Sequence, residues 1–194
     1  MNSEHAPHTR SCGACSLCCT VLRVDELKKL GGVSCKHQCE GGGCAIHETR
    51  PGICRAYKCL WLSGGLADDD RPDSLGAIVD ILTVGAETRV SIQEATPNAF
   101  DSSPRLQEIS AQYRDAMPVR VVEYGNFLDP DRPYRVLLGD GEEHRVRGEW
   151  TTVLRPGAEP ERRRLSAFER LARRIAVWIR SRKISGMQRP DDGS

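Results

Sequence analysis

Alternation of apolar and polar residues predicts a β-hairpin near the middle of the chain. Residues 76–84, GAIVDILTV, form an apolar run of strand length, and residues 89–93, RVSIQ, alternate between polar and apolar positions. A strand-length run followed by an alternating one is typical of two neighbouring strands. We therefore expect an antiparallel pair with Gly85 to Thr88 as its turn.

A helix and further strands are predicted after this hairpin. Ser103 and Pro104 have the residue types typical of a helix cap and first position, and Leu106, Ile109 and Tyr113 then share one helical face. Strands are predicted at VRVVEY (119–124), YRVLL (134–138) and EHRVRGEW (143–150), with Gly139 to Gly141 turning the chain between the last two. The pattern predicts an α+β fold with a mixed, mainly antiparallel sheet.

Residues 160–185 predict a basic amphipathic helix. Its apolar stripe consists of Leu165, Phe168, Leu171, Ala172, Ile175, Trp178 and Ile179. Outside the stripe lie Arg163, Arg170, Arg173, Arg174 and Arg180. We expect the stripe to pack on the sheet and the arginines to face solvent, where they could dock an acidic protein partner. An anionic membrane surface is the alternative partner, whereas no RNA-binding or helix-turn-helix pattern favours a nucleic acid.

The net charge of the chain is only +1, but its charged residues and its cysteines are unevenly distributed along the sequence. Residues 61–154 carry nine basic against seventeen acidic residues, and residues 155–194 carry eleven against five, so an acidic middle precedes a basic tail. All nine cysteines fall in the first third. This division predicts a cysteine-cluster module over residues 1–66 and an α+β scaffold over residues 67–194.

Disulfide bonds between the nine cysteines are not needed to stabilise the fold. A chain of 194 residues can bury a core without them, and an odd number cannot pair completely. The amino terminus has no apolar leader, and no later run approaches the roughly 20 apolar residues that cross a bilayer. We therefore expect a cytoplasmic protein without a transmembrane segment, whose reduced thiols serve metal or redox chemistry.

The first four cysteines have the spacing of metal ligands. Cys12, Cys15 and Cys18 form a double C-x-x-C, which can aim successive sulfurs at one zinc ion and also resembles the start of an iron–sulfur ligand run. Cys19 follows directly. Neighbouring side chains diverge in both helices and strands, so Cys18 and Cys19 predict two different metal positions or one multinuclear cluster.

A second group of cysteines lies among glycine-rich turns. It comprises Cys35, Cys39, Cys44, Cys54 and Cys59. Gly41 to Gly43 come just before Cys44, and glycine permits the close backbone approach that a loop around a metal needs. The segment is poor in apolar residues. We therefore expect metal binding to contribute to its folding free energy.

The combined pattern resembles that of the YkgJ-like cysteine-cluster proteins, described as a zinc- or iron-chelating domain. The resemblance covers residues 12 to about 60 and is carried by Cys12, Cys15, Cys18, Cys19, Cys35, Cys44, Ile46, Arg50, Pro51, Cys54, Arg55 and Cys59. Ser16 stands where the family usually has glycine, and His47 where it usually has tyrosine.

The resemblance implies metal chelation by eight of the nine cysteines. These are Cys12, Cys15, Cys18, Cys19, Cys35, Cys44, Cys54 and Cys59. Eight thiolates are enough for two four-thiolate sites or one multinuclear cluster, which leaves Cys39 as a spare thiol and the histidines outside the ligand set. Arg50 and Arg55 are expected to balance the thiolate charge.

Two hypotheses about function stay open. One is a chelating or structural zinc or iron centre that serves binding or assembly; the other is an iron–sulfur cluster in an electron-transfer component of an oxidoreductase. Cysteine serves both metals, so the sequence does not choose between them. The chain has no G-x-S-x-G, no phosphate-binding glycine loop and no H-E-x-x-H, and no catalytic residue is assigned.

Overall fold

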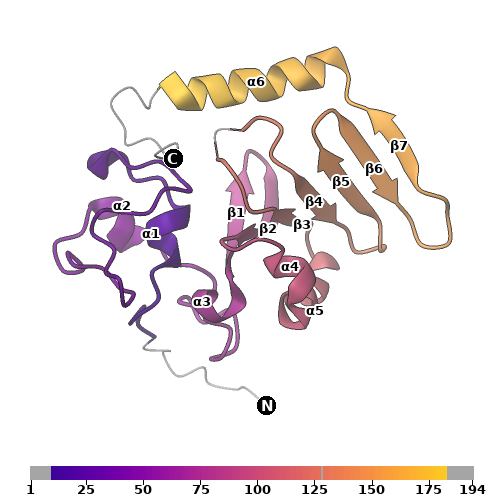
Figure 1. Ribbon diagram of the computed structural model, residues 1–194. Helices are drawn as coiled ribbons and strands as arrows, with labels where there is room; N and C mark the ends of the chain where they lie inside the picture. The colour runs from indigo at the N-terminus through magenta and orange to yellow at the C-terminus, as the bar shows by residue number, and fades with distance from the viewer. Residues whose placement is uncertain (1–9, 128, 183–194) are drawn as a thin grey trace.

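The computed structural model describes residues 10–127 and 129–182 (Figure 1). Within these residues one sheet has seven strands, ordered as in the sequence: β1 (Ala77–Val84), β2 (Glu87–Glu94), β3 (Val119–Val122), β4 (Tyr134–Leu137), β5 (Glu143–Arg147), β6 (Trp150–Leu154) and β7 (Glu161–Arg164). β2 and β3 pair in parallel, and the other neighbours are antiparallel. The predicted α+β class and mainly antiparallel sheet are confirmed.

The predicted hairpin forms β1 and β2, with Ile81 opposite Val90. Its turn is shorter than expected, because residue 88 already belongs to β2 and pairs with Thr83. Only the first part of the apolar run enters the core. Ala77 to Val79 are buried, whereas the side chains toward the tip, Val84 included, are exposed.

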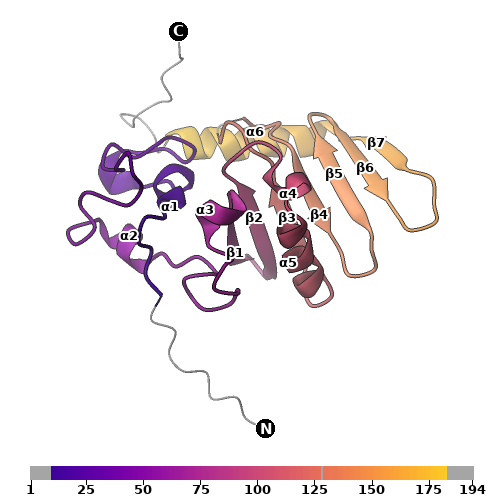
Figure 2. The ribbon, with the colours of Figure 1, turned by 60° about the horizontal axis from the view of Figure 1, so that its bottom comes forward.

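Two helices connect the parallel strands β2 and β3. α4 (Ala99–Ser102) and α5 (Pro104–Arg114) form the crossover that a parallel pair requires, and they lie against one face of the sheet (Figure 2). The predicted cap is confirmed, since Ser103 Oγ accepts a hydrogen bond of 3.2 Å from the Leu106 N–H. Leu106 and Ile109 are completely buried, so the apolar face of α5 is the one that packs on the strands.

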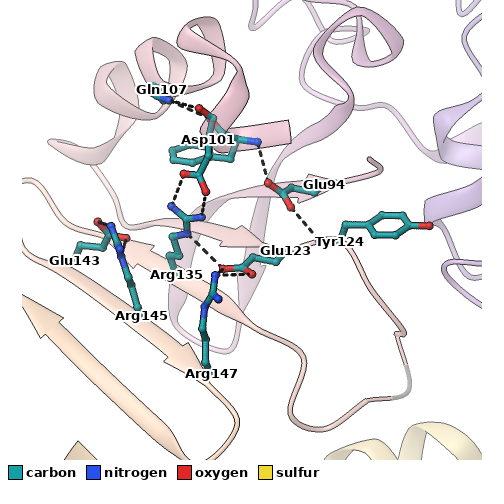
Figure 3. Close-up of polar contacts among 10 residues, drawn as sticks. Glu94, Asp101, Gln107, Glu123, Tyr124, Arg135, Glu143, Arg145 and Arg147 are labelled. Carbon is teal, nitrogen blue, oxygen red and sulfur yellow. Dashed lines mark hydrogen bonds and ion pairs between the residues drawn. The ribbon is translucent and has the colours of Figure 1, made fainter. Parts of the chain in front are cut away.

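Buried charged groups fasten this crossover to the sheet (Figure 3). The Glu94 carboxylate is buried and accepts hydrogen bonds from the backbone N–H groups of Phe100 and Tyr124, at 2.8 and 2.9 Å. Arg135 is also buried and donates to Asp101 at 2.7 Å. Because an uncompensated buried charge is costly, these contacts fix α4 relative to β4.

The chain before β1 lies beside that strand and contains short helices: α1 (Leu17–Val21), the 3₁₀ helix η1 (Asp25–Leu27), α2 (Gly52–Ala56) and α3 (Pro72–Leu75) (Figures 1 and 2). Its buried residues Val21, Trp61 and Leu66 belong to the same hydrophobic cluster as Val79 and Val90 of the sheet. The core therefore crosses residue 66, and the predicted division into two domains stays a prediction.

The carboxy-terminal helix begins later than predicted. Residues 161–164 form the edge strand β7, paired with β6, and the Arg162 guanidinium stacks on the Trp150 ring at 4.2 Å. The helix itself, α6, spans Ala167–Arg182. The predicted part beyond residue 182, and the side chains of residues 179 and 180, lie outside the described residues.

Four residues of the predicted apolar stripe face solvent, so the expectation that the stripe packs on the sheet is wrong for them, whereas Leu165, just before α6, is buried. The exposed fractions are 79% for Phe168, 55% for Leu171, 45% for Ile175 and 52% for Trp178. Arginines take the inner side instead: Arg170 pairs with Glu149, and Arg173 donates to the Tyr134 hydroxyl at 2.9 Å. Across the described residues, no helix combines the length and apolar character needed to cross a bilayer.

The Asp70–Arg105 ion pair joins the loop before α3 to α5. Asp70 is buried and accepts hydrogen bonds from Arg105 Nε and a terminal guanidinium nitrogen at 2.7 and 2.8 Å. These bonds hold the pKa of Asp70 below its usual value. A lowered folded pKa stabilises the fold above the unfolded pKa, about 3.9, and this stabilisation is lost as pH falls through the folded pKa.

We predict that Asp70→Asn lowers the free energy of unfolding by about 1–3 kcal/mol near neutral pH. The difference from the unmodified protein should shrink as the pH falls below the unfolded pKa of about 3.9 and through the lower folded pKa, because the native carboxylate is then being protonated. Urea titrations at several pH values measure both effects. Asp69→Asn, at an exposed neighbouring position, is the control and should leave the free energy of unfolding unchanged. A difference in unfolding free energy between Asp70→Asn and the unmodified protein that does not vary with pH would contradict the prediction.

Candidate metal centre

A backbone turn and a short helix position the first four cysteines. The Cys15 N–H donates to the Cys12 carbonyl at 2.9 Å, which closes a turn. Cys18 and Cys19 lie on α1, whose helical geometry begins only at residue 17. A helical turn over the whole of residues 12–19 therefore does not form, and the first two cysteines reach the site from a loop.

The second group of cysteines is brought to the first by backbone contacts. The Cys35 N–H donates to the Cys19 carbonyl at 3.0 Å. Gly42 has a φ of +87°, and a Cβ there would lie 2.2 Å from the Ala14 carbonyl oxygen. The expected close approach of the glycine-rich turn is confirmed at this position. It places the loop that carries Cys44 against the first cysteine turn.

The last two ligand candidates lie on and just after α2. Pro51 occupies the cap position of this helix, Cys54 lies within it, and Cys59 follows it and is buried. The Arg50 Nε donates to the Cys54 carbonyl at 3.4 Å, and Arg55 donates to the Arg50 carbonyl at 2.9 Å. Both arginines thus brace the backbone around the cysteines.

Eight of the nine cysteines line one cavity of about 160 Å³, called the cysteine cavity below. They are Cys12, Cys15, Cys18, Cys19, Cys35, Cys44, Cys54 and Cys59. Arg50, Arg55 and His47 also line it, and much of the remaining wall is apolar. Cys39 is exposed and is not part of this wall, and neither is His37. The eight lining cysteines are the same eight that the family resemblance implies.

The cysteine cavity gathers these thiols without forming a ready coordination shell. Over residues 10–127 and 129–182, no group of three or more His, Cys, Asp and Glu side chains is arranged so that it could hold a metal ion. All nine cysteines are free thiols. The structure therefore places the eight cysteines together, while their binding of a metal stays a prediction.

The adjacent cysteines Cys18 and Cys19 both line the cysteine cavity and interact electrostatically. A hydrogen bond from the Cys18 thiol, together with the nearby charge of Lys29, lowers the pKa of Cys19 to about 7. The same hydrogen bond and burial raise the pKa of Cys18. A second bond, from Cys44, also favours the Cys19 thiolate. Three cysteines from two segments therefore stabilise negative charge at one sulfur.

Burial opposes ionisation of most of the other lining thiols. Loss of solvent raises the pKa of Cys15, Cys44, Cys54 and Cys59. A bare thiolate at these four positions is thus unfavourable, and a metal ion would have to displace their protons and supply the balancing positive charge.

Lys29 is a buried cation beside the cysteine cavity that the sequence analysis missed. Its side chain is 1% exposed, and its Nζ donates to the carbonyls of Thr20 at 3.1 Å, Leu30 at 2.9 Å and Leu22. Burial lowers its pKa to about 8, and the nearby cysteines, Cys35 first, oppose this shift. The ammonium group therefore both satisfies carbonyls at the end of α1 and faces the thiols.

The wall of the cavity is tied to the sheet through Tyr57. Its hydroxyl donates to the Asp80 carboxylate on β1 at 2.8 Å, and burial raises the pKa of Asp80 to about 6. The Leu60 N–H donates to the Val79 carbonyl at 2.9 Å. These contacts make the cavity continuous with the first strand of the scaffold.

Comparisons of the chain with protein-family models, with curated proteins and with solved structures found no match. The likeness to the YkgJ-like proteins therefore rests on the cysteine motif itself.

We predict that Lys29→Met lowers the free energy of unfolding by about 2–4 kcal/mol, because buried carbonyls lose their donor. Lys28→Met removes the same charge from an exposed neighbouring side chain and should change stability by less than about 0.5 kcal/mol. Denaturant unfolding of the two variants provides the comparison. Equal losses would show that charge alone, and not the hydrogen bonds of Lys29, determines the effect.

Proposed function

We propose that the protein binds zinc or iron in a thiolate centre formed by the eight cysteines of the cysteine cavity. One observation carries this proposal: cysteines from separate turns and helices line the same cavity, whereas Cys39 is exposed outside it. Packing alone does not require eight thiols in one place. Thiolates are preferred ligands of both zinc and iron.

The geometry favours one shared, multinuclear centre over two independent sites. All eight cysteines face one cavity, Cys18, Cys19 and Cys44 among them. Eight thiolates exceed the four that a single tetrahedral ion takes. Neighbouring ions that share sulfur ligands would account for both the number of cysteines and their contacts.

The other residues of the site have roles that suit such a centre. Lys29, Arg50 and Arg55 bring positive charge to a cavity that would hold several thiolates, and the glycine-rich turn shapes the loop around it. When bound, the metal would supply folding free energy to a segment with little regular structure. A chelating or structural role in a reducing, cytoplasmic compartment follows from the proposal.

An iron–sulfur cluster with an electron-transfer role is the alternative occupant, because the same ligands hold it. Protein purified without oxygen separates the two. A zinc centre leaves the protein colourless, whereas an iron–sulfur cluster gives a brown protein with visible sulfur-to-iron absorption.

We predict that Cys19→Ala and Cys54→Ala each lower the metal bound per chain, because each removes a ligand from the centre. Cys39→Ala is the matched control and should retain the full metal content, since Cys39 lies outside the cavity. Elemental analysis of the purified proteins measures the difference. The ligand assignment fails if Cys39→Ala loses as much metal as Cys54→Ala, or if Cys19→Ala loses none.

Removal of the metal by a strong chelator should loosen residues 12–59 more than the sheet. Strand residues such as Val90, Val119 and Val121 are completely buried, so their amide protection should persist after chelation. Hydrogen exchange on metal-loaded and chelated protein measures this. Equal protection of residues 12–59 in the two states would show that the metal does not stabilise the segment.

A further inference from the structure

Helix α6 presents its apolar side to solvent and its arginine side to the protein. The outward-facing apolar residues, called the outer stripe, are Phe168, Leu171, Ile175 and Trp178. They recur at spacings of three and four residues, so they form one continuous stripe along the helix. In Figures 1 and 2 the helix runs from the end of β7 across the molecule toward α1 and α2.

Specific contacts of its inner side hold α6 in this orientation. Arg173 donates to the Gly148 carbonyl at 3.3 Å and to the Tyr134 hydroxyl at 2.9 Å, and its guanidinium lies 5.3 Å from the centre of the Tyr134 ring. Arg170 pairs with Glu149. These contacts come from strands and turns of the sheet. These inner contacts therefore determine that the outer stripe faces away from the sheet.

The start of α6 is also fixed. Ser166 Oγ accepts a hydrogen bond from the Glu169 N–H at 3.2 Å, and the Glu169 carboxylate accepts one from the Ser166 N–H at 2.8 Å. This reciprocal pair is a capping box. Arg163 of β7 adds an ion pair with Glu169 at 3.1 Å. The helix thus begins at a defined residue next to the edge strand.

The outer stripe lies in a basic part of the chain. Arg174 is exposed on the helix itself, whereas the arginines of β7 have partners: Arg162 stacks on Trp150, Arg163 pairs with Glu169 and Arg164 pairs with Glu149. Residues 155–194 as a whole carry eleven basic against five acidic residues. An apolar stripe with aromatic residues and basic neighbours is typical of helices that lie in the interface of an anionic bilayer.

A second copy of the chain fits this surface less well. Four side chains on one helix offer much less than the roughly 800 Å² per partner of a standard interface. Pairing two copies of α6 would also bring two basic segments together, which is electrostatically unfavourable. A lipid surface avoids both problems, because it matches the charge and accepts a stripe of any length.

We propose that α6 binds the protein to the surface of a membrane that contains anionic lipids, with the outer stripe inserted among the acyl chains near the headgroups. Phe168 and Trp178 supply the aromatic side chains that favour this depth. The arginines around the stripe face the lipid phosphates. The helix lies parallel to the bilayer and does not span it. This role is independent of the proposed metal centre.

Vesicle co-sedimentation of the full chain tests the proposal. The protein should bind vesicles of phosphatidylcholine with about a third phosphatidylserine more tightly than pure phosphatidylcholine vesicles, and salt should weaken the binding. Leu171→Asp should reduce binding about tenfold or more, since it removes an inserted side chain and adds a negative charge. Its melting temperature should not change, because Leu171 is already 55% exposed.

Val84→Asp is the matched control. Val84 at the tip of the β1–β2 hairpin is an apolar residue with the same 55% exposure, but it lies outside α6. This variant should bind anionic vesicles as the unmodified protein does. An equal loss in both variants would show that any surface charge of this kind weakens binding, and it would overturn the assignment to α6.

Three other results would also overturn the proposal. The first is no binding to anionic vesicles, with binding to a soluble acidic polypeptide such as polyglutamate, which would indicate an acidic protein partner. The second is no vesicle binding with a dimer that Leu171→Asp dissociates, which would indicate a second copy. The third is a clear fall in the melting temperature of Leu171→Asp, which would indicate that the stripe is buried against the protein.

Discussion

The burial of eight thiols around one cavity is the constraint on which the amino-terminal third depends. Burial raises the pKa values of Cys15, Cys44 and Cys59, so these thiols are difficult to ionise without a positive partner. Lys29 supplies one fixed positive charge, at the cost of losing nearly all of its solvent contact. The cations that line the cavity, Lys29, Arg50, Arg55 and Lys58, are fewer than eight thiolates would require. The metal centre that we propose would displace the thiol protons and compensate the charge together.

The cavity and the sheet depend on each other. Trp61 and Val21 are buried in the same cluster as the central strands, and the Leu60 N–H is bonded to the carbonyl of Val79. The loops around the cysteines therefore rest on β1, which in turn is held by β2. The buried Glu94 and Arg135 contacts then keep the helical crossover in place on the sheet. The cations beside the thiols come from the loops of the cavity itself, while the position of the cavity is set by the scaffold.

Local pattern predicted much of this fold, but not the features that depend on long-range contacts. The β1–β2 hairpin and the Ser103 cap were predictable because alternation and capping act within a few residues. Lys29 was not, since nothing in the sequence separates it from its exposed neighbour Lys28. The orientation of α6 was not predictable either: an amphipathic pattern shows that a helix has two faces, while contacts such as Arg173 with Tyr134 decide which face turns inward. The cysteine spacing indicated a shared site, but the lowered pKa of Cys19 depends on Cys18, Lys29 and Cys44, which come together only in the fold.

X-ray absorption at the zinc and iron edges, on protein purified without oxygen, tests the central claim most directly. The account predicts a first shell of sulfur only, at about 2.3 Å if the metal is zinc, with a second metal ion in the next shell because the eight cysteines share one cavity. A first shell of nitrogen and oxygen at about 2.0–2.2 Å, or protein that binds neither metal, would contradict it.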